Sequence, residues 1–144
     1  TVILTLTGEQ LEQAFLNGFS PACNPAVSTG RFPQVSGLSV TYTCSGTTPE
    51  VTGMWKAPDG PGGTLTPIGP TDTVRFVTND FMFTGGDGYT VFGSATDVLF
   101  TGEVLLDVVV DHIRTNSPVS PPFPETITGS GVCAEPNDCR IVRE

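Results

Sequence analysis

One segment of the sequence concentrates the residue types that could bind a small polar ligand: residues 79–89, which read N-D-F-M-F-T-G-G-D-G-Y. Asp87 stands among three glycines, whose backbone can adopt positive φ and can let a ligand come close. A carboxylate in such a turn can accept hydrogen bonds from two adjacent hydroxyls, as acidic side chains do when they bind ribose. Phe81, just before the turn, offers an aromatic face. The alternative is a structural turn in which Asp87 bonds local amides and Phe81 lies in the core.

A second aromatic residue stands where it could stack on a flat ligand. Residues 29–37 read T-G-R-F-P-Q-V-S-G and place Phe32 directly before a proline, at the junction of a loop and a strand. A phenylalanine in this place either plugs the core or presents a stacking surface. Stacking of a base on an aromatic ring contributes about 1–3 kcal/mol and tolerates different bases. The residues alone leave both roles open.

The other reactive side chains indicate neither a catalytic site nor a metal site. His112, the single histidine, falls on the polar side of a predicted helix, which is typical of a surface residue. Ser36 and Ser94 lack the G-x-S-x-G pattern of a nucleophile elbow, and the glycine turn lacks the G-K-[ST] of a phosphate-binding loop. The absence of C-x-x-C spacing argues against an autonomous zinc site. We therefore expect no cofactor in this chain.

The composition excludes several classes of protein. A length of 144 residues fits one domain. The formal net charge of −9 argues against binding to a nucleic acid polymer, which needs a basic face. No run of about 18 apolar residues occurs, so we expect no membrane span. Because the sequence starts at Thr1 without a methionine or a signal-peptide pattern, we interpret it as a processed or excised piece of a longer chain.

The cysteines indicate the compartment. Four are present, and sequence alone allows three pairings. We favour a bridge between Cys133 and Cys139, because Pro, Asn and Asp between them suit a tight reversal. That choice leaves Cys23 to pair with Cys44. Disulfides point to a place outside the cytoplasm, and the alternative is four unpaired buried thiols in a cytosolic protein.

Strands and two helices would position these residues. A capping-box pattern, Thr7 with Gln10, starts the first helix, and Gly18 is expected to end it. A second helix has Thr101 as its N-cap candidate and ends before Pro118. Strands are predicted at residues 1–6, 34–43, 51–55 and 74–78, with an edge strand at 125–128, a loop at 19–30 and a turn at 56–63.

Together these elements predict an α+β fold with mixed, largely antiparallel sheet layers and flanking helices. The strand at 74–78 is expected to continue into N-D-F-M-F before the glycine turn. Phe81 and Asp87 would therefore lie at the end of a strand, where the chain reverses.

Several motifs resemble the C-terminal domain of the 5′-nucleotidase family, which includes UDP-sugar hydrolases and 2′,3′-cyclic phosphodiesterase-like enzymes. The motifs are L-T-G-E-Q-L at 6–11, G-R-F-P-Q-V-S-G-L at 30–38, T-N-D-F-M-F-T-G-G-D-G-Y at 78–89 and D-V-V-V-D-H-I at 107–113. Each is weak alone, but the second and third together are specific. They follow the family's order and spacing.

The resemblance implies a binding role for particular residues. In the family, the phenylalanines that match Phe32 and Phe81 sandwich the nucleobase, and the aspartate that matches Asp87 binds the ribose hydroxyls. The substrate-binding residues that we predict on this basis are Phe32, Phe81, Asp87, Asn79, Gly85, Gly86 and Gly88.

The resemblance also implies what lies outside this chain. The family's catalytic Asp–His pair and its two divalent metals belong to an N-terminal metallophosphatase domain, and its C-terminal domain begins with an N-x-G-G-x-R-like segment. Residues 1–144 therefore correspond to the latter part of a single C-terminal domain, incomplete at its N-terminus. We expect this fragment alone to be inactive as a hydrolase, even with added metal.

Two functions compete at this point. The first is a nucleoside- or nucleotide-recognition domain of an extracytoplasmic nucleotide hydrolase, located outside the cell, in the periplasm or in the cell envelope. Its partners would be the nucleotide and the metallophosphatase domain or another upstream fragment. The alternative is a secreted, disulfide-stapled structural or adhesion module that keeps the fold and has lost the ligand.

Overall fold

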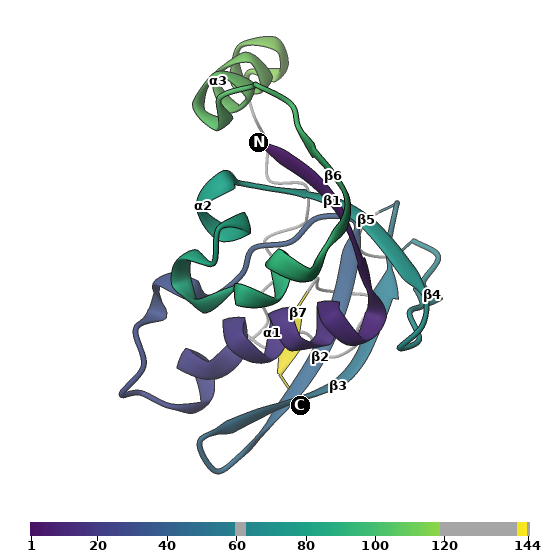
Figure 1. Ribbon diagram of the computed structural model, residues 1–144, viewed down its shortest axis with the longest axis vertical. Coiled ribbons are helices and arrows are strands. Elements are labelled where there is room, and N and C mark those ends of the chain that lie inside the picture. Colours follow the sequence, from purple (N-terminus) through teal and green to yellow (C-terminus); the bar gives the residue numbers. More distant parts are fainter. Residues whose placement is uncertain (60–62, 119–140, 144) are drawn as a thin grey trace.

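The computed structural model describes residues 1–59, 63–118 and 141–143, which form two sheets and three helices (Figure 1). One sheet has the strand order β5–β1–β6, formed by β1 (Val2–Thr7), β5 (Thr73–Thr78) and β6 (Thr96–Phe100). The other has the order β4–β3–β2–β7, formed by β2 (Leu38–Ser45), β3 (Thr48–Lys56), β4 (Thr66–Pro67) and β7 (Ile141–Arg143). The helices are α1 (Gly8–Cys23), α2 (Asp80–Phe83) and α3 (Leu105–Asn116), with 3₁₀ turns η1 (Thr29–Arg31), η2 (Gly86–Gly88) and η3 (Thr90–Ser94).

The predicted α+β fold with largely antiparallel sheets is confirmed. β1 pairs with β5 and with β6 in antiparallel fashion, and β2 pairs with β3 in the same way. Only β7, which lies beside β2, runs parallel to its neighbour among the described strands. The predicted strands 34–43 and 51–55 are β2 and β3 with shifted ends, whereas β4, β6 and β7 were not predicted.

Helix α1 begins as predicted but continues further. The hydroxyl of Thr7 accepts from the Gln10 amide and the Gln10 side chain accepts from the Thr7 amide, so the capping box is complete. The predicted end at Gly18 is wrong, and the helix continues to Cys23. Gly18 provides close packing instead, because a Cβ there would lie 2.6 Å from the hydroxyl oxygen of Tyr89. The predicted loop at 19–30 is therefore wrong for its first five residues.

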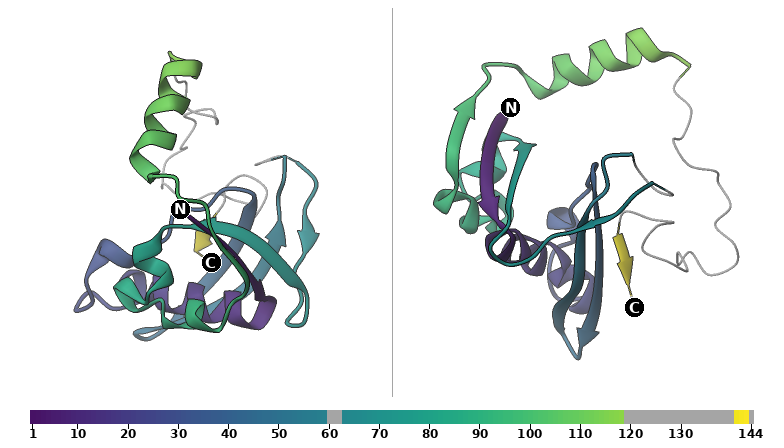
Figure 2. Two further views of the ribbon diagram at one scale, coloured as in Figure 1. Left: turned by 45° about the horizontal axis from the view of Figure 1, so that its top comes forward. Right: turned by 90° about the vertical axis from the view of Figure 1, so that its right-hand side faces the viewer.

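Two apolar clusters form the core, and α1 contributes to both. Towards the four-stranded sheet, α1 packs its buried residues against β2 and β3; the main members of this first cluster are Leu11, Phe15, Phe19, Val40, Tyr42 and Met54. Towards the three-stranded sheet, the second cluster consists of Val2, Leu4, Leu6, Ala14, Tyr89 and Phe92. Helix α1 thus connects the two sheets, and Figure 2 shows it at the base between them.

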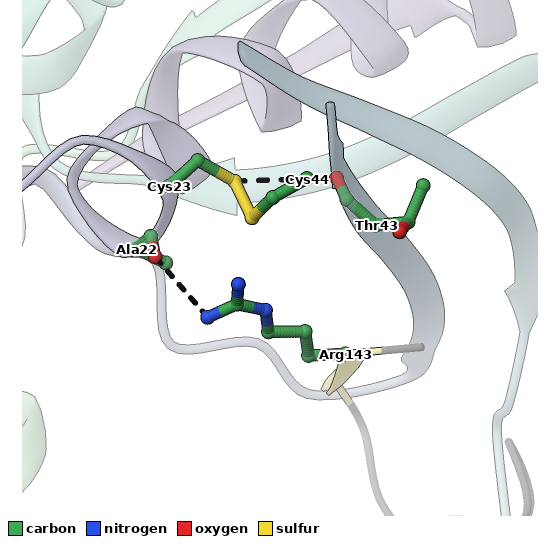
Figure 3. The surroundings of a disulfide bond; sticks show 5 residues. All are labelled: Ala22, Cys23, Thr43, Cys44 and Arg143. Carbon is green, nitrogen blue, oxygen red and sulfur yellow. Dashed lines mark hydrogen bonds between the residues drawn. A yellow bond between two sulfur atoms is a disulfide. The ribbon is translucent and has the colours of Figure 1, made fainter. Parts of the chain in front are cut away.

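A disulfide ties the end of α1 to β2. Cys23 and Cys44 are bonded, with their Cα atoms 5.5 Å apart, which confirms this predicted pair. Figure 3 shows the bridge together with Arg143 of β7, whose guanidinium donates to the Ala22 carbonyl at 3.3 Å. Cys133 and Cys139 lie outside the described residues, as does the predicted edge strand at 125–128.

Loss of this bridge should lower stability measurably. Replacing both Cys23 and Cys44 with serine opens a loop with a sequence separation of 21. A loop of this length gives an expected loss of about 3 kcal/mol in the free energy of unfolding, because the unfolded chain gains conformational freedom. Urea denaturation of the double variant and of the natural chain, in the same buffer, measures the difference. An unchanged midpoint would contradict the prediction.

Helix α3 stands apart from the two sheets (Figures 1 and 2). The predicted cap is wrong: Val104 is the N-cap residue, without a side-chain bond. Thr101 instead joins the chain start, because both its amide and its hydroxyl donate to the Thr1 carbonyl, at 3.1 and 3.2 Å. His112 is exposed, as predicted. None of the described helices has the length and apolar character needed to cross a membrane.

Candidate functional site

The strand before the glycine turn ends earlier than predicted. β5 stops at Thr78, and the side-chain oxygen of Asn79 accepts from the Met82 amide at 2.7 Å. This N-cap starts the short helix α2, so the prediction that N-D-F-M-F continues the strand is wrong. The reason is local, because an asparagine cap satisfies an amide that the helix leaves unpaired. A local role for Asn79 is thus established.

Helix α2 turns two apolar side chains inward and leaves Phe81 outside. Met82 and Phe83 pack against the second core cluster, and Phe83 makes an edge contact with Phe100 of β6 at 5.4 Å between ring centroids. Phe81 is 57% exposed and belongs to neither cluster. The alternative in which Phe81 is a core residue is therefore wrong.

The ring of Phe81 lies against the glycine turn. A Cβ on Gly86 would come within 2.5 Å of the Phe81 ring, so only glycine leaves room for the ring in this place. An exposed ring held by a neighbouring backbone offers its free surface to a flat molecule. The arrangement suits the predicted stacking role.

Asp87 occupies a left-handed turn and presents its carboxylate to solvent. Its φ of 53° lies between Gly85 at 92° and Gly88 at 81°. Aspartate tolerates this region better than most residues. The side chain is exposed, and within the described part of the chain its carboxylate oxygens accept no hydrogen bond. The alternative in which this carboxylate bonds local amides does not hold there, and it can accept from a ligand.

Phe32 has a role in packing. It directly follows η1, and its ring lies 5.6 Å from that of Phe19 at an interplanar angle of 43°. It is half-buried and packs against the first core cluster. Phe32 and Phe81 make no ring contact with each other among the described aromatic pairs. The nucleobase sandwich between them stays a prediction.

Hydrogen bonds join the segment of Phe32 to the turn of Asp87. The Tyr89 hydroxyl donates to the Arg31 carbonyl at 2.7 Å. The Arg31 guanidinium donates to the side-chain oxygen of Asn17 at 3.2 Å, and the Asn17 amide group donates to the Asp87 carbonyl at 3.0 Å. Two segments that are far apart in the sequence thus meet on α1. The motifs contain Arg31, Asp87 and Tyr89 but do not reveal these contacts, and Asn17 lies outside the motifs.

Burial raises the pKa of the Tyr89 hydroxyl. Its side chain is almost fully buried in the second core cluster. Burial, together with the nearby Asp87 carboxylate, raises the pKa of Tyr89 to about 12, although the Arg31 charge acts in the opposite direction. The hydroxyl therefore stays protonated, and keeps its role as a donor, in more alkaline solution than an ordinary tyrosine with its pKa of 10 would. Sequence reasoning missed Tyr89 and Asn17, because nothing in their local pattern indicates a distant partner.

A shallow, open groove of about 520 Å³ runs beside the turn. Asn17 of α1 and Gly88 of η2 line it, together with residues of η3, but Phe32 and Phe81 do not. In the described part of the chain, no three His, Cys, Asp or Glu side chains gather as metal ligands would. The exposed Phe81 ring and the Asp87 carboxylate offer stacking and hydrogen bonding to a ligand.

The model of the family described as 5′-nucleotidase, C-terminal domain, matches residues 1–94, which include β1, α1, the Phe32 segment and the Asp87 turn. The chain belongs to this family. The resemblance of the motifs is thereby confirmed, and the chain is a nucleotidase-associated domain.

Relatives of this 5′-nucleotidase C-terminal domain are much longer than the chain. The trifunctional nucleotide phosphoesterase protein YfkN of Bacillus subtilis (strain 168) is 32% identical over 112 residues, which cover 78% of this chain and 7% of that protein. The crystal structure of a 5′-nucleotidase precursor from Thermus thermophilus matches with a TM-score of 0.69 and 26% identity, covering 99% of this chain and 24% of that one. The Haemophilus influenzae NAD nucleotidase (NadN) shares the fold, with a TM-score of 0.65, 15% identity and the same coverages.

Proposed function

We propose that this chain is the latter part of the substrate-binding domain of an extracytoplasmic nucleotide hydrolase, and that it binds the nucleoside half of the substrate. One observation carries the proposal: the exposed Phe81 ring lies on Gly86, next to a turn whose Asp87 carboxylate has no partner among the described residues. These residues fall within the stretch that matches the 5′-nucleotidase C-terminal domain.

Each residue has a distinct task in this proposal. Phe81 stacks on one face of the nucleobase and Phe32 on the other, which tolerates different bases. Asp87 accepts hydrogen bonds from the two ribose hydroxyls. Asn79 holds the start of α2, and the glycines of the turn keep the approach to Asp87 open. Affinity for a nucleoside should be weak, since two stacks of about 1–3 kcal/mol each barely exceed the cost of association.

Hydrolysis itself would occur in another part of the protein. The chain spans 24% of each of the two solved nucleotidase chains described above, and we propose that an N-terminal metallophosphatase domain with two divalent metals cleaves the phosphoester. This domain would also supply cations for the phosphate, because a net charge of −9 repels it. The disulfide between Cys23 and Cys44 supports a location outside the cytoplasm.

The surface that we propose for contact with the rest of the protein is apolar. Ile3 pairs with Val77 on one side and with Leu99 on the other, so the three share the open face of the first sheet, where Val77 and Leu99 are more than half exposed. α3 and the residue before it add further exposed apolar side chains, namely Val104, Leu105, Leu106, Val108, Val109 and Ile113. Exposed apolar surface of this extent is typical of an interface.

We take the occupant of this surface to be the polypeptide that precedes Thr1 in the longer protein. The backbone nitrogen of Thr1 lies 2.6 Å from the Glu103 carbonyl oxygen, just before α3 begins, and in a longer chain it would be a peptide amide. Any preceding residue would therefore start close to the beginning of α3. This position supports the upstream part of the same protein as the partner that covers the exposed side chains of α3.

Ribose recognition by Asp87 provides the test. Replacing Asp87 with alanine should weaken the binding of adenosine about two- to tenfold, because a typical hydrogen bond contributes about 0.5–1.5 kcal/mol and the exposure of this carboxylate to water offsets the larger contribution of a charged acceptor. The same substitution should leave the affinity for 2′,3′-dideoxyadenosine unchanged, since this ligand lacks both hydroxyls. Titrations followed by NMR chemical shifts measure both affinities.

Two results would overturn the proposal. One is the absence of shifts at Phe32, Phe81 and Asp87 with millimolar adenosine, which would favour a structural or adhesion module instead. The other is an equal loss of affinity for both ligands in the Asp87→Ala variant, which would assign Asp87 a role in shape and not in ribose recognition.

A further inference from the structure

We propose that Asn17, Arg31 and Tyr89 form a clamp that holds the Phe32 segment and the Asp87 turn in fixed register, so that one nucleoside can contact both. This inference rests on the proposed function and adds positioning residues to it. None of the three needs to touch the ligand. Each acts through the backbone or side chain of a neighbour.

The first half of the clamp fixes the approach to Phe32. Arg31 immediately precedes Phe32, and its carbonyl accepts from the Tyr89 hydroxyl at 2.7 Å. Tyr89 lies two positions after Asp87 and is only 3% exposed, so its ring is held by the second core cluster. The Tyr89 hydroxyl therefore connects the backbone beside Phe32 to a buried residue close to Asp87.

The second half depends on an amide side chain. Arg31 can only donate and the Asp87 carbonyl can only accept, so the group between them must accept on one side and donate on the other. Asn17 does both, at 3.2 and 3.0 Å. Gly88 makes the approach possible, since a Cβ there would lie 2.7 Å from the side-chain oxygen of Asn17. Because Asn17 lies on α1, both ligand-binding segments are hydrogen-bonded to the same helix.

The clamp has a consequence that simple structural support would not have. Adenosine spans the aromatic rings and the Asp87 carboxylate, whereas adenine can reach only the rings. If the clamp sets the register between the rings and the Asp87 carboxylate, its loss must lower the affinity for adenosine more than the affinity for adenine. A substitution that merely lowers stability leaves the ratio of the two affinities unchanged in the folded protein.

Two variants of the full chain test this ratio. Tyr89→Phe removes only the hydroxyl, and Asn17→Asp keeps the acceptor for Arg31 but loses the donor to the Asp87 carbonyl. We expect each variant to lower the affinity for adenosine about three- to tenfold, which is the effect of one or two lost hydrogen bonds. The affinity for adenine should change less than about twofold. Tyr42→Phe is the matched control, because it removes a hydroxyl from another buried tyrosine, in the first core cluster. It should leave both affinities unchanged.

The outcomes separate the clamp from the function on which it rests. Selective loss of adenosine affinity in both variants supports the clamp. If the natural chain binds adenosine and the two variants lose adenine and adenosine equally, or lose neither, the clamp is refuted while the proposed function stands. If the natural chain fails to bind adenosine, the proposed function falls, and the clamp falls with it.

Discussion

Replacing Phe19 with alanine should lower the free energy of unfolding by about 3–5 kcal/mol, the range for an aromatic residue removed from a packed core. Phe19 has no exposed surface, and its ring stacks on Phe15 at 5.4 Å and on Tyr42 at 4.2 Å. The cavity would open where α1 meets the four-stranded sheet. This is the largest effect on stability that we expect.

Chemical denaturation monitored by circular dichroism measures the Phe19→Ala effect. Gln13→Ala is the matched control, because this residue is exposed on the same helix and its loss should change stability by less than about 0.5 kcal/mol. A loss below about 1 kcal/mol for Phe19→Ala would mean that α1 does not pack on β2 and β3 as described.

Replacing Phe81 with alanine should produce the largest loss of nucleoside binding. Removal of one stacking ring costs about 1–3 kcal/mol of binding free energy, which lowers the affinity for adenosine at least about fivefold. Stability should barely change, because the ring is 57% exposed and lies outside both core clusters. The same reasoning predicts that Phe81→Trp keeps binding, since the indole ring also stacks.

Adenosine titration and denaturation of the same samples test both parts of the Phe81 prediction. Val77→Ala serves as the control, because Val77 is similarly exposed, at 61%, and lies just before the site in β5. Equal affinities for Phe81→Ala and the natural chain would show that the ring does not contact the ligand. A large loss of stability would show instead that the ring supports the fold.

Local patterns predicted the elements whose causes are local. The capping box of Thr7 and Gln10 involves residues three positions apart, and the alternation in β1 reports directly which side chains are buried. The predicted helix end at Gly18 was wrong because glycine is found both at the ends of helices and at places where another residue packs closely against the helix. Here the neighbours are Tyr89 and Pro33, which only the folded chain brings near.

The motifs predicted which residues form the candidate site, but they did not predict the contacts that support those residues. The motifs identified Phe32, Phe81 and Asp87, and the structure places Phe81 and Asp87 in suitable surroundings. Asn79 was named as part of a strand, although its side chain caps a helix. The contacts of Asn17 with Arg31 and Asp87 join three separate segments, and no periodicity within one segment reports such contacts.

The exposed apolar side chains of α3 bear on how the isolated chain behaves in the test tube. We expect the exposed residues Leu105, Val109 and Ile113 to promote adsorption to chromatography media and to air–water interfaces, and self-association at high protein concentration. The titrations described above should therefore use dilute protein with a large excess of nucleoside, because self-association in concentrated samples would obscure weak binding.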